Sequence, residues 1–207
     1  MKTNLFRKSA LAVALSLPLF AAAESNFQST TGAGALTATA KLDFKITIPK
    51  VLFLQVGTGT ANATNATVDL MDFTVPAANV GSGTAVAASA TSGDLFNGIV
   101  TARVIGNNGT VTFTSTTLGA LGNGAGDTIS YAQIATAAAA NTTATTLAHP
   151  ALVDGATTSV TLTPVGKIVN QDAKWTFTYK NTNIVAPGTY GGVNLNNGRV
   201  TYTASMP

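Results

Sequence analysis

The chain has 207 residues, of which only 9% are charged and none is cysteine, so thiolate chemistry, cysteine metal ligands and disulfide bonds are excluded. Its 11 basic residues outnumber its 8 acidic ones, but Lys2, Arg7 and Lys8 lie at the extreme N-terminus. Without them the charges balance at 8 against 8, which leaves no net positive charge to attract nucleic acid or an anionic membrane.

The first 23 residues have the features of a cleavable export signal. A basic region precedes the apolar stretch Ala10–Phe20, and Ala21–Ala23 supplies the small residues that signal peptidase accepts. We predict a signal peptide over residues 1–23 with cleavage before Glu24, and therefore export through the periplasm to the cell surface. The apolar stretch is too short for a permanent anchor and no later stretch is longer, so we expect no transmembrane segment in the mature chain.

Residues 24–48 combine a flexible lead with the clearest pattern in the chain. Residues 24–35 are rich in Ser, Thr and Gly, whereas residues 36–48 alternate with a period of two, as in a strand with one buried face. The apolar face carries Leu36, Ala38, Ala40, Leu42, Phe44, Ile46 and Ile48.

This alternating segment must dock somewhere. Burial of Leu42, Phe44, Ile46 and Ile48 is worth on the order of 6–12 kcal/mol, at about 1.5–3 kcal/mol for each side chain. That estimate does not decide between the chain's own sheet and a neighbour's. The N-terminal position, the flexible lead and the break at Pro49 favour insertion into a neighbouring subunit.

Residues 49–207 are predicted to form one β-sandwich domain of roughly eight to ten short strands. We expect a strand buried on both faces at Val51–Val56, strands at Val68–Val75 and near Thr84–Ala88, and a hairpin of Ile99–Ile105 with Thr110–Thr116 through Asn107-Asn108-Gly109. Further strands are expected at Thr128–Ile134, Ser159–Pro164, Lys174–Lys180 and Arg199–Ala204, with another run beginning at Tyr190 and a second hairpin turn at Asn196-Asn197-Gly198. Ala135–Ala148 is expected to be a loop or a short helical turn.

Candidate catalytic residues are few. His149 is the single histidine, with Asp154 and Ser159 nearby in the sequence, but no Gly-x-Ser-x-Gly elbow accompanies it, so we expect an exposed loop histidine. Asp69 and Asp72 fall on opposite faces of their predicted strand and do not form a carboxylate pair. We therefore predict that the protein is not an enzyme.

Cofactor and metal sites are likewise not indicated. The loop at residues 122–127 resembles one unit of a calcium-binding Gly/Asp repeat but occurs once, and a solvated turn is the favoured interpretation. The Gly-rich loops lack the lysine and the following helix of a phosphate-binding loop. We predict no cofactor and no metal ion.

Trp175, Phe177 and Tyr179 share one face of a predicted strand. Three aromatic residues on one strand face are more often part of a core than a platform for sugar binding, so the core interpretation is favoured. The platform remains the basis of an alternative function: a monomeric secreted or periplasmic β-sandwich that binds carbohydrate or another surface ligand.

Several of these features together resemble the cysteine-free pilins of the chaperone–usher class. They are the export signal, the alternating segment, Pro49, the sequence Val51-Leu52-Phe53-Leu54-Gln55, and Pro187-Gly188-Thr189-Tyr190-Gly191-Gly192-Val193. The resemblance implies an incomplete immunoglobulin-like antiparallel sandwich that is completed by the donated N-terminal strand of the next subunit. Leu42, Phe44, Ile46 and Ile48 would then be the donor residues that fill the neighbour's pockets.

The resemblance also implies partners: further copies of the same chain, a periplasmic chaperone and an outer-membrane usher. The sequence departs from the pilin pattern where Asn196-Asn197-Gly198 separates the Tyr-Gly turn from the last strand, and a filament that assembles itself by donor-strand exchange is also compatible. We predict an exported structural subunit of a pilus or fimbria.

Overall fold

The computed structural model describes residues 25–207, and the predicted signal peptide lies outside the described residues. The chain divides into two units at the peptide bond between Ile48 and Pro49. Residues 25–48 form no strand, and the second unit carries all the strands of the described part. No helix within residues 25–207 is long and apolar enough to cross a membrane.

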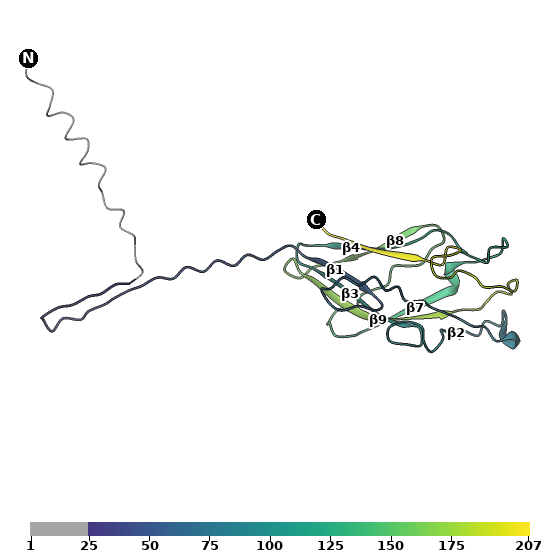
Figure 1. Ribbon diagram of the computed structural model, residues 1–207, viewed down its shortest axis with the longest axis horizontal. Coiled ribbons are helices and arrows are strands. Elements are labelled where there is room, and N and C mark those ends of the chain that lie inside the picture. The colour runs from purple at the N-terminus through teal and green to yellow at the C-terminus, as the bar shows by residue number, and fades with distance from the viewer. Residues whose placement is uncertain (1–24) are drawn as a thin grey trace, which may run out of the picture. The chain divides into compact units, whose positions relative to one another are not determined.

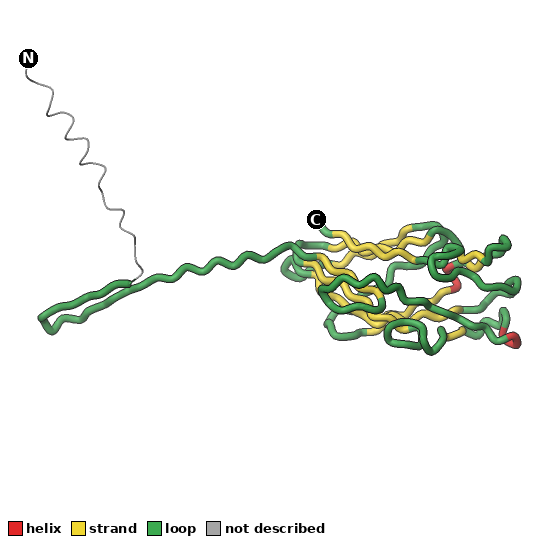
Figure 2. The backbone as a smooth tube through the Cα atoms, viewed as in Figure 1, coloured by secondary structure: helices red, strands yellow, loops and turns green. Residues whose placement is uncertain are grey.

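The second unit is an all-β sandwich of antiparallel strands, which confirms the predicted fold class (Figures 1 and 2). One sheet has the order β1 (Leu52–Val56), β3 (Ile99–Gly106), β9 (Val169–Tyr179) and β7 (Ile134–Ala139), and β2 (Val86–Ala87) pairs with the end of β9. The other sheet has the order β10 (Val200–Ser205), β4 (Val111–Thr117) and β8 (Thr157–Leu162). Two-residue strands β5 (Leu121–Gly122) and β6 (Thr128–Ile129) pair with each other, and the short helices are η1 (Ala77–Asn79) and η2 (Tyr131–Gln133).

The core lies between the central strands of the two sheets. Inward residues of β3 and β4 alternate with outward ones as the period-two pattern requires, and Val104 and Phe113 are fully buried. The ring of Phe113 stacks on Trp175 at a centroid distance of 5.9 Å, and the Trp175 indole N–H donates to the carbonyl of Leu147 at 2.8 Å. Trp175, Phe177 and Tyr179 are all buried, so the core interpretation of that strand face is confirmed.

Several predicted elements are corrected by the pairing. β3 and β4 do not form a hairpin, because β3 pairs with β1 and β9 while β4 pairs with β10 and β8, so the turn at Asn107-Asn108-Gly109 carries the chain from one sheet to the other. The Ala/Thr tract contains strand β7, because the edge of β9 offers a partner that overrides the helix propensity of alanine.

Three more of the predicted elements are wrong. β1 is an edge strand of half-buried residues and is not buried on both faces. Residues 68–75 are extended but have no ladder partner. Residues 190–198 form a tight loop in which Asn194, Asn196 and Asn197 adopt positive φ, so this stretch contains neither the expected run nor a hairpin.

The sandwich has two distinct ends. At the near end, where Pro49 begins the second unit, the Asn107 side chain donates to the carbonyl of Pro49 and accepts from the N–H of Val51, both at 2.8 Å. The Asn108 amide donates to the carbonyl of Pro207, and the N–H of Gly109 donates to the carbonyl of Lys167. These bonds bring the start of β1, two turns and the C-terminal residue together.

The far end lies at the other end of β4, where the loop at residues 118–122 meets the loop at residues 191–198. Asn197 donates through its side-chain amide to the carbonyl of Ala120 at 3.0 Å, and backbone bonds join Gly122 to Asn196 and Gly191. The hydroxyl of Tyr131 donates to the carbonyl of Asn197 at 2.7 Å and ties these loops to η2.

Candidate functional site

The alternating segment at residues 36–48 is extended and pairs with no strand in the described part of the chain. The four predicted donor side chains lie largely in solvent, with exposed fractions of 71% for Leu42, 84% for Phe44, 85% for Ile46 and 77% for Ile48. Exposed apolar residues scattered singly on a surface are ordinary, but four in register on one face of an extended segment form a preorganised apolar stripe. The segment thus has the pattern and conformation of a strand but belongs to no sheet in the described part of the chain.

Pro49 and Asn107 set the boundary of this segment. Proline has no backbone N–H to donate to a ladder, and its ring disfavours helical geometry at Ile48. The Asn107 side chain then fixes Pro49 and Val51 to the near end of the sandwich. The segment therefore leaves a rigid attachment point directly, with no linker between Ile48 and the folded unit.

The sandwich has incompletely covered flanks where β1 and β10 lie. Within the described residues, β1 pairs only with β3 and β10 only with β4, so each strand has one edge without a ladder. The two strands approach each other across the sheets without pairing. Their inward side chains pack against the core but are only partly buried, in contrast to the fully buried inward positions of β3. These side chains are Leu54 and Val56 of β1 and Tyr202 and Ala204 of β10, and Met206, directly after β10, is partly buried in the same way.

Residues 68–75 are a second segment that lacks a strand partner in the described structure. Met71 and Phe73 pack against the core and are half-buried, while Leu70 and Asp72, which alternate with them, are exposed. The segment is held at two points: Asp69 accepts from the hydroxyl and N–H of Thr58, and the backbone of Asp72 bonds to Ser89 and Ser92. A segment with strand alternation and no strand partner has backbone groups available for pairing.

Tyr202 connects the free-edged strand β10 to the interior. Its hydroxyl lies 2.7 Å from Nε2 of His149, and its ring stacks on Phe113 at a centroid distance of 6.0 Å. His149 is packed edge-on against Trp175, Phe177 and Tyr202 at centroid distances of 4.6, 5.4 and 5.6 Å. The expectation of an exposed loop histidine is therefore wrong, because the ring of His149 is half-buried against aromatic side chains of β9 and β10.

Burial in this aromatic cluster changes the ionisation of both partners. Loss of hydration lowers the pKa of His149 from 6.5 to about 4, against an opposing effect of a hydrogen bond with the Pro150 backbone. Burial raises the pKa of Tyr202 well above its ordinary value. His149 is thus neutral and Tyr202 protonated at neutral pH, and the pair acts as a structural hydrogen bond.

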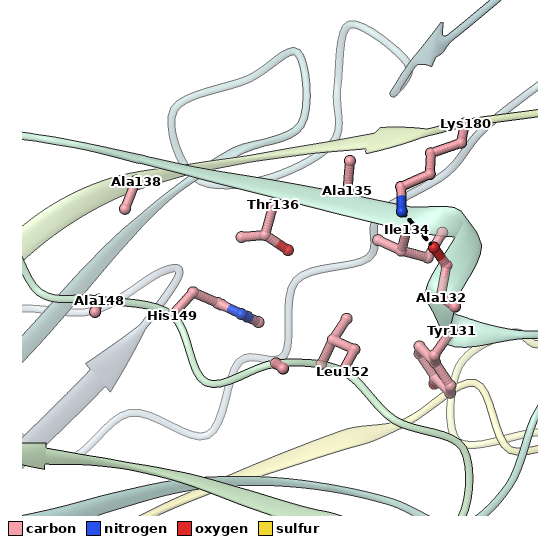
Figure 3. Close-up of a pocket in the computed structure, with 11 residues that line it drawn as sticks. Tyr131, Ala132, Ile134, Ala135, Thr136, Ala138, Ala148, His149, Leu152 and Lys180 are labelled. Atoms are coloured by element: carbon pink, nitrogen blue, oxygen red, sulfur yellow. Dashed lines mark hydrogen bonds between the residues drawn. The ribbon is translucent and has the colours of Figure 1, made fainter.

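A cavity with a volume of about 520 Å³ lies beside β7 (Figure 3). Its wall on one side is β7 with η2, and on the other side is the segment that carries His149 and Leu152. Lys180 donates to the carbonyl of Ala132 at 2.7 Å at its margin, and most of the remaining lining is alanine. This mostly apolar lining offers few convergent polar groups that would select a small molecule.

The structure brings together none of the candidate catalytic groups. Asp154 accepts from the N–H of Tyr131 at 2.7 Å, His149 bonds Tyr202, and Ser159 faces Thr114 in the β4–β8 ladder. Asn123 donates to Asp127 at 2.8 Å within the Gly-rich loop, as expected for a turn held by its own side chains. No cluster of metal-ligating side chains occurs within residues 25–207.

One buried charge was not anticipated from the sequence. Asp172 on β9 accepts hydrogen bonds from the N–H and hydroxyl groups of Thr142 and Thr143 and from the side chain of Asn141. Burial alone would raise its pKa, but these donors outweigh that effect and lower the pKa to about 2. The carboxylate fixes the loop that returns the chain from β7 into the core at Leu147. A Thr-Thr pair and an Asp far apart in sequence give no local signal of this contact.

Comparisons with known proteins do not add to this description. No protein-family model, curated protein or solved structure matches the chain.

Proposed function

We propose that this protein is the structural subunit of an extracellular filament in which residues 36–48 of one copy complete the sandwich of the next. One observation carries the proposal: the same chain has an apolar strand without a sheet and a sandwich with partly covered edge strands. The stripe of Leu42, Phe44, Ile46 and Ile48 is exposed, while the inward residues of β1 and β10 are only half-buried. An exposed apolar stripe and a half-covered sheet edge are each unfavourable in a single copy. Insertion of the stripe of one copy beside the edge of another removes both from water.

The dimensions of the two elements are compatible. β10 spans 6 residues, and the apolar part of the segment from Leu42 to Ile48 is of nearly equal length. Insertion beside β10 would pair its free backbone edge and place alternate side chains of the segment over the core, which is the β-augmentation mode of peptide recognition. The stripe pairs with no strand in the described part of the chain, which supports a donated strand that comes from another copy.

A point substitution with a matched control tests the proposal. The mature protein with Phe44→Asp is compared with Thr47→Asp, which places the same charge on the opposite face of the segment. Loss of the Phe44 contact alone weakens association by about 2–3 kcal/mol, roughly 30- to 150-fold. Sedimentation and electron microscopy should show filaments for the unmodified protein and Thr47→Asp, and monomers for Phe44→Asp.

A different outcome would contradict the proposed filament. If the unmodified mature protein stays monomeric, and hydrogen exchange shows protected amides across residues 42–48, the segment pairs within its own sheet. The filament proposal would then be wrong.

The structure does not favour the alternative of a carbohydrate-binding monomer. That function required exposed aromatic residues on β9, and Trp175 is completely buried. The cavity beside β7 has no aromatic platform other than the edges of Tyr131 and His149.

A further inference from the structure

Two exposed apolar clusters lie at opposite ends of the sandwich and are not used by the donated strand. At the near end, Val165 and Ile168 are 86% and 55% exposed. At the far end, Leu118, Val193 and Leu195 are 78%, 70% and 60% exposed. We call the first cluster the near-end tip and the second the far-end loops.

The near-end tip is rigid. Val165 and Ile168 exchange both backbone hydrogen bonds across a two-residue turn, and Gly166 and Lys167 have φ angles of 57° and 70°. Positive φ at both central positions is the geometry of a type I′ turn, which glycine adopts without strain at its first position. Directly opposed residues point to the same face, so the turn presents two apolar side chains together. The bond from Gly109 to Lys167 anchors the turn to the rest of the near end.

Chain continuity determines what the near end must face in a filament. Ile48, the last donor residue, is bonded to Pro49, which is fixed to the near end by Asn107. With no linker between them, a neighbour that holds Ile48 lies within a residue or two of this end. The near-end tip therefore lies at the junction between successive subunits.

The direction of the donated strand determines which part of the neighbour is met. If the strand ran parallel to β10, Ile48 would lie at the neighbour's near end, where the neighbour's own Pro49 leaves the fold. Each near end would then have to accommodate both neighbours at one place, which crowds that end and leaves the far-end loops uncovered. An antiparallel strand places Ile48 beside Val200, at the far end, and generates an open head-to-tail array.

We propose, on the basis of the proposed function, that the near-end tip of one copy packs against the far-end loops of the next. The contact is a second interface between copies of this chain, separate from the donated strand. It pairs Val165 and Ile168 with Leu118, Val193 and Leu195, so that both exposed clusters are covered in every internal subunit. It holds successive sandwiches in a fixed relative orientation, which the single covalent connection at Pro49 does not do alone.

Engineered cysteines test this interface cleanly because the natural chain has none. Mature protein carrying Val165→Cys with Leu195→Cys is allowed to assemble, treated with a short bismaleimide linker, and analysed on denaturing gels. A ladder of covalent multimers is expected. Val165→Cys alone should remain monomeric on the gel, and so should Val165→Cys combined with Lys174→Cys on the exposed outer face of β9.

The outcomes separate this inference from the proposed function. Filaments with no ladder for Val165→Cys with Leu195→Cys would overturn the second interface and leave strand donation intact. Crosslinked dimers from Val165→Cys alone would show near ends meeting, which also overturns it. If the unmodified protein forms no filaments, the proposed function fails and the second interface fails with it.

Discussion

The hydrogen bond between His149 and Tyr202 predicts a specific dependence of stability on pH. His149 is surrounded by Trp175, Phe177 and Tyr202, and its pKa is lowered from 6.5 to about 4. In the unfolded chain the imidazole takes up a proton below pH 6.5, whereas in the folded chain it does so only near pH 4. The unfolded state binds more protons between these values, so the free energy of unfolding falls as the pH falls through this window.

The magnitude follows from the two pKa values. Linkage gives a loss of about 2 kcal/mol between pH 7 and pH 5 and about 3 kcal/mol at pH 4, after which the loss levels off. Asp172 contributes little to this change, because its stabilisation is lost mainly between its ordinary pKa of 3.8 and its lowered pKa of about 2. The effect is large compared with a total stability of about 5–15 kcal/mol for a domain.

Urea unfolding monitored by Trp175 fluorescence measures this dependence directly. The natural protein and His149→Gln are compared at pH 7, 6, 5 and 4, at a protein concentration where both are monomeric. The variant should be less stable at pH 7 but nearly independent of pH in this window. Equal losses of stability in the two proteins between pH 7 and pH 5 would refute the assignment of a neutral, buried His149.

Three further predictions concern other parts of the molecule. Asp172→Asn should lower the free energy of unfolding by about 3 kcal/mol, because an amide cannot accept from all the Thr142 and Thr143 donors; urea titration at pH 7 measures this, and a change below 1 kcal/mol would contradict it. Trp175→Ala should cost about 3–5 kcal/mol by thermal or urea unfolding, whereas Phe27→Ala in the exposed lead should cost nothing measurable. A synthetic peptide of residues 36–48 in excess should shorten filaments by occupying β10, and the same peptide with Phe44→Asp should not; equal effects of the two peptides on length by electron microscopy would argue against strand insertion.

The fold class was predictable because it depends on local patterns that tertiary contacts reinforce. The alternation of Trp175, Phe177 and Tyr179 marks a half-buried strand, and β9 bears it out. The sheet in which a strand lies is not a local property. Asn107-Asn108-Gly109 has the composition of a hairpin turn. Whether the turn joins two paired strands or connects the two sheets depends on the strands with which β3 and β4 pair, and these are far away in the sequence.

The candidate site was predictable in part. The donor stripe is visible in the sequence because alternating apolar and polar residues followed by a proline are enough to indicate it. The receiving edge was not visible, because half-burial on β1 and β10 is a property of the assembled sheets. His149 was misjudged for a related reason: the turn-like sequence around Pro150 suggested a surface loop, and only its packing against Trp175, Phe177 and Tyr202 in the folded chain reveals its burial.

The anchoring of Pro49 by Asn107 has a mechanical consequence. In a filament under tension, load enters each sandwich at Pro49 and is directed along β1, whose ladder to β3 runs from Leu52 opposite Gly106 to Val56 opposite Ala102. Antiparallel ladder bonds lie perpendicular to the strands, so a pull along β1 loads them together in shear instead of opening them one after another. The same holds for a strand inserted beside β10. The β1 ladder bears this load within each sandwich, and the hydrogen bonds of Asn107 to Pro49 and Val51 hold its loaded end in place.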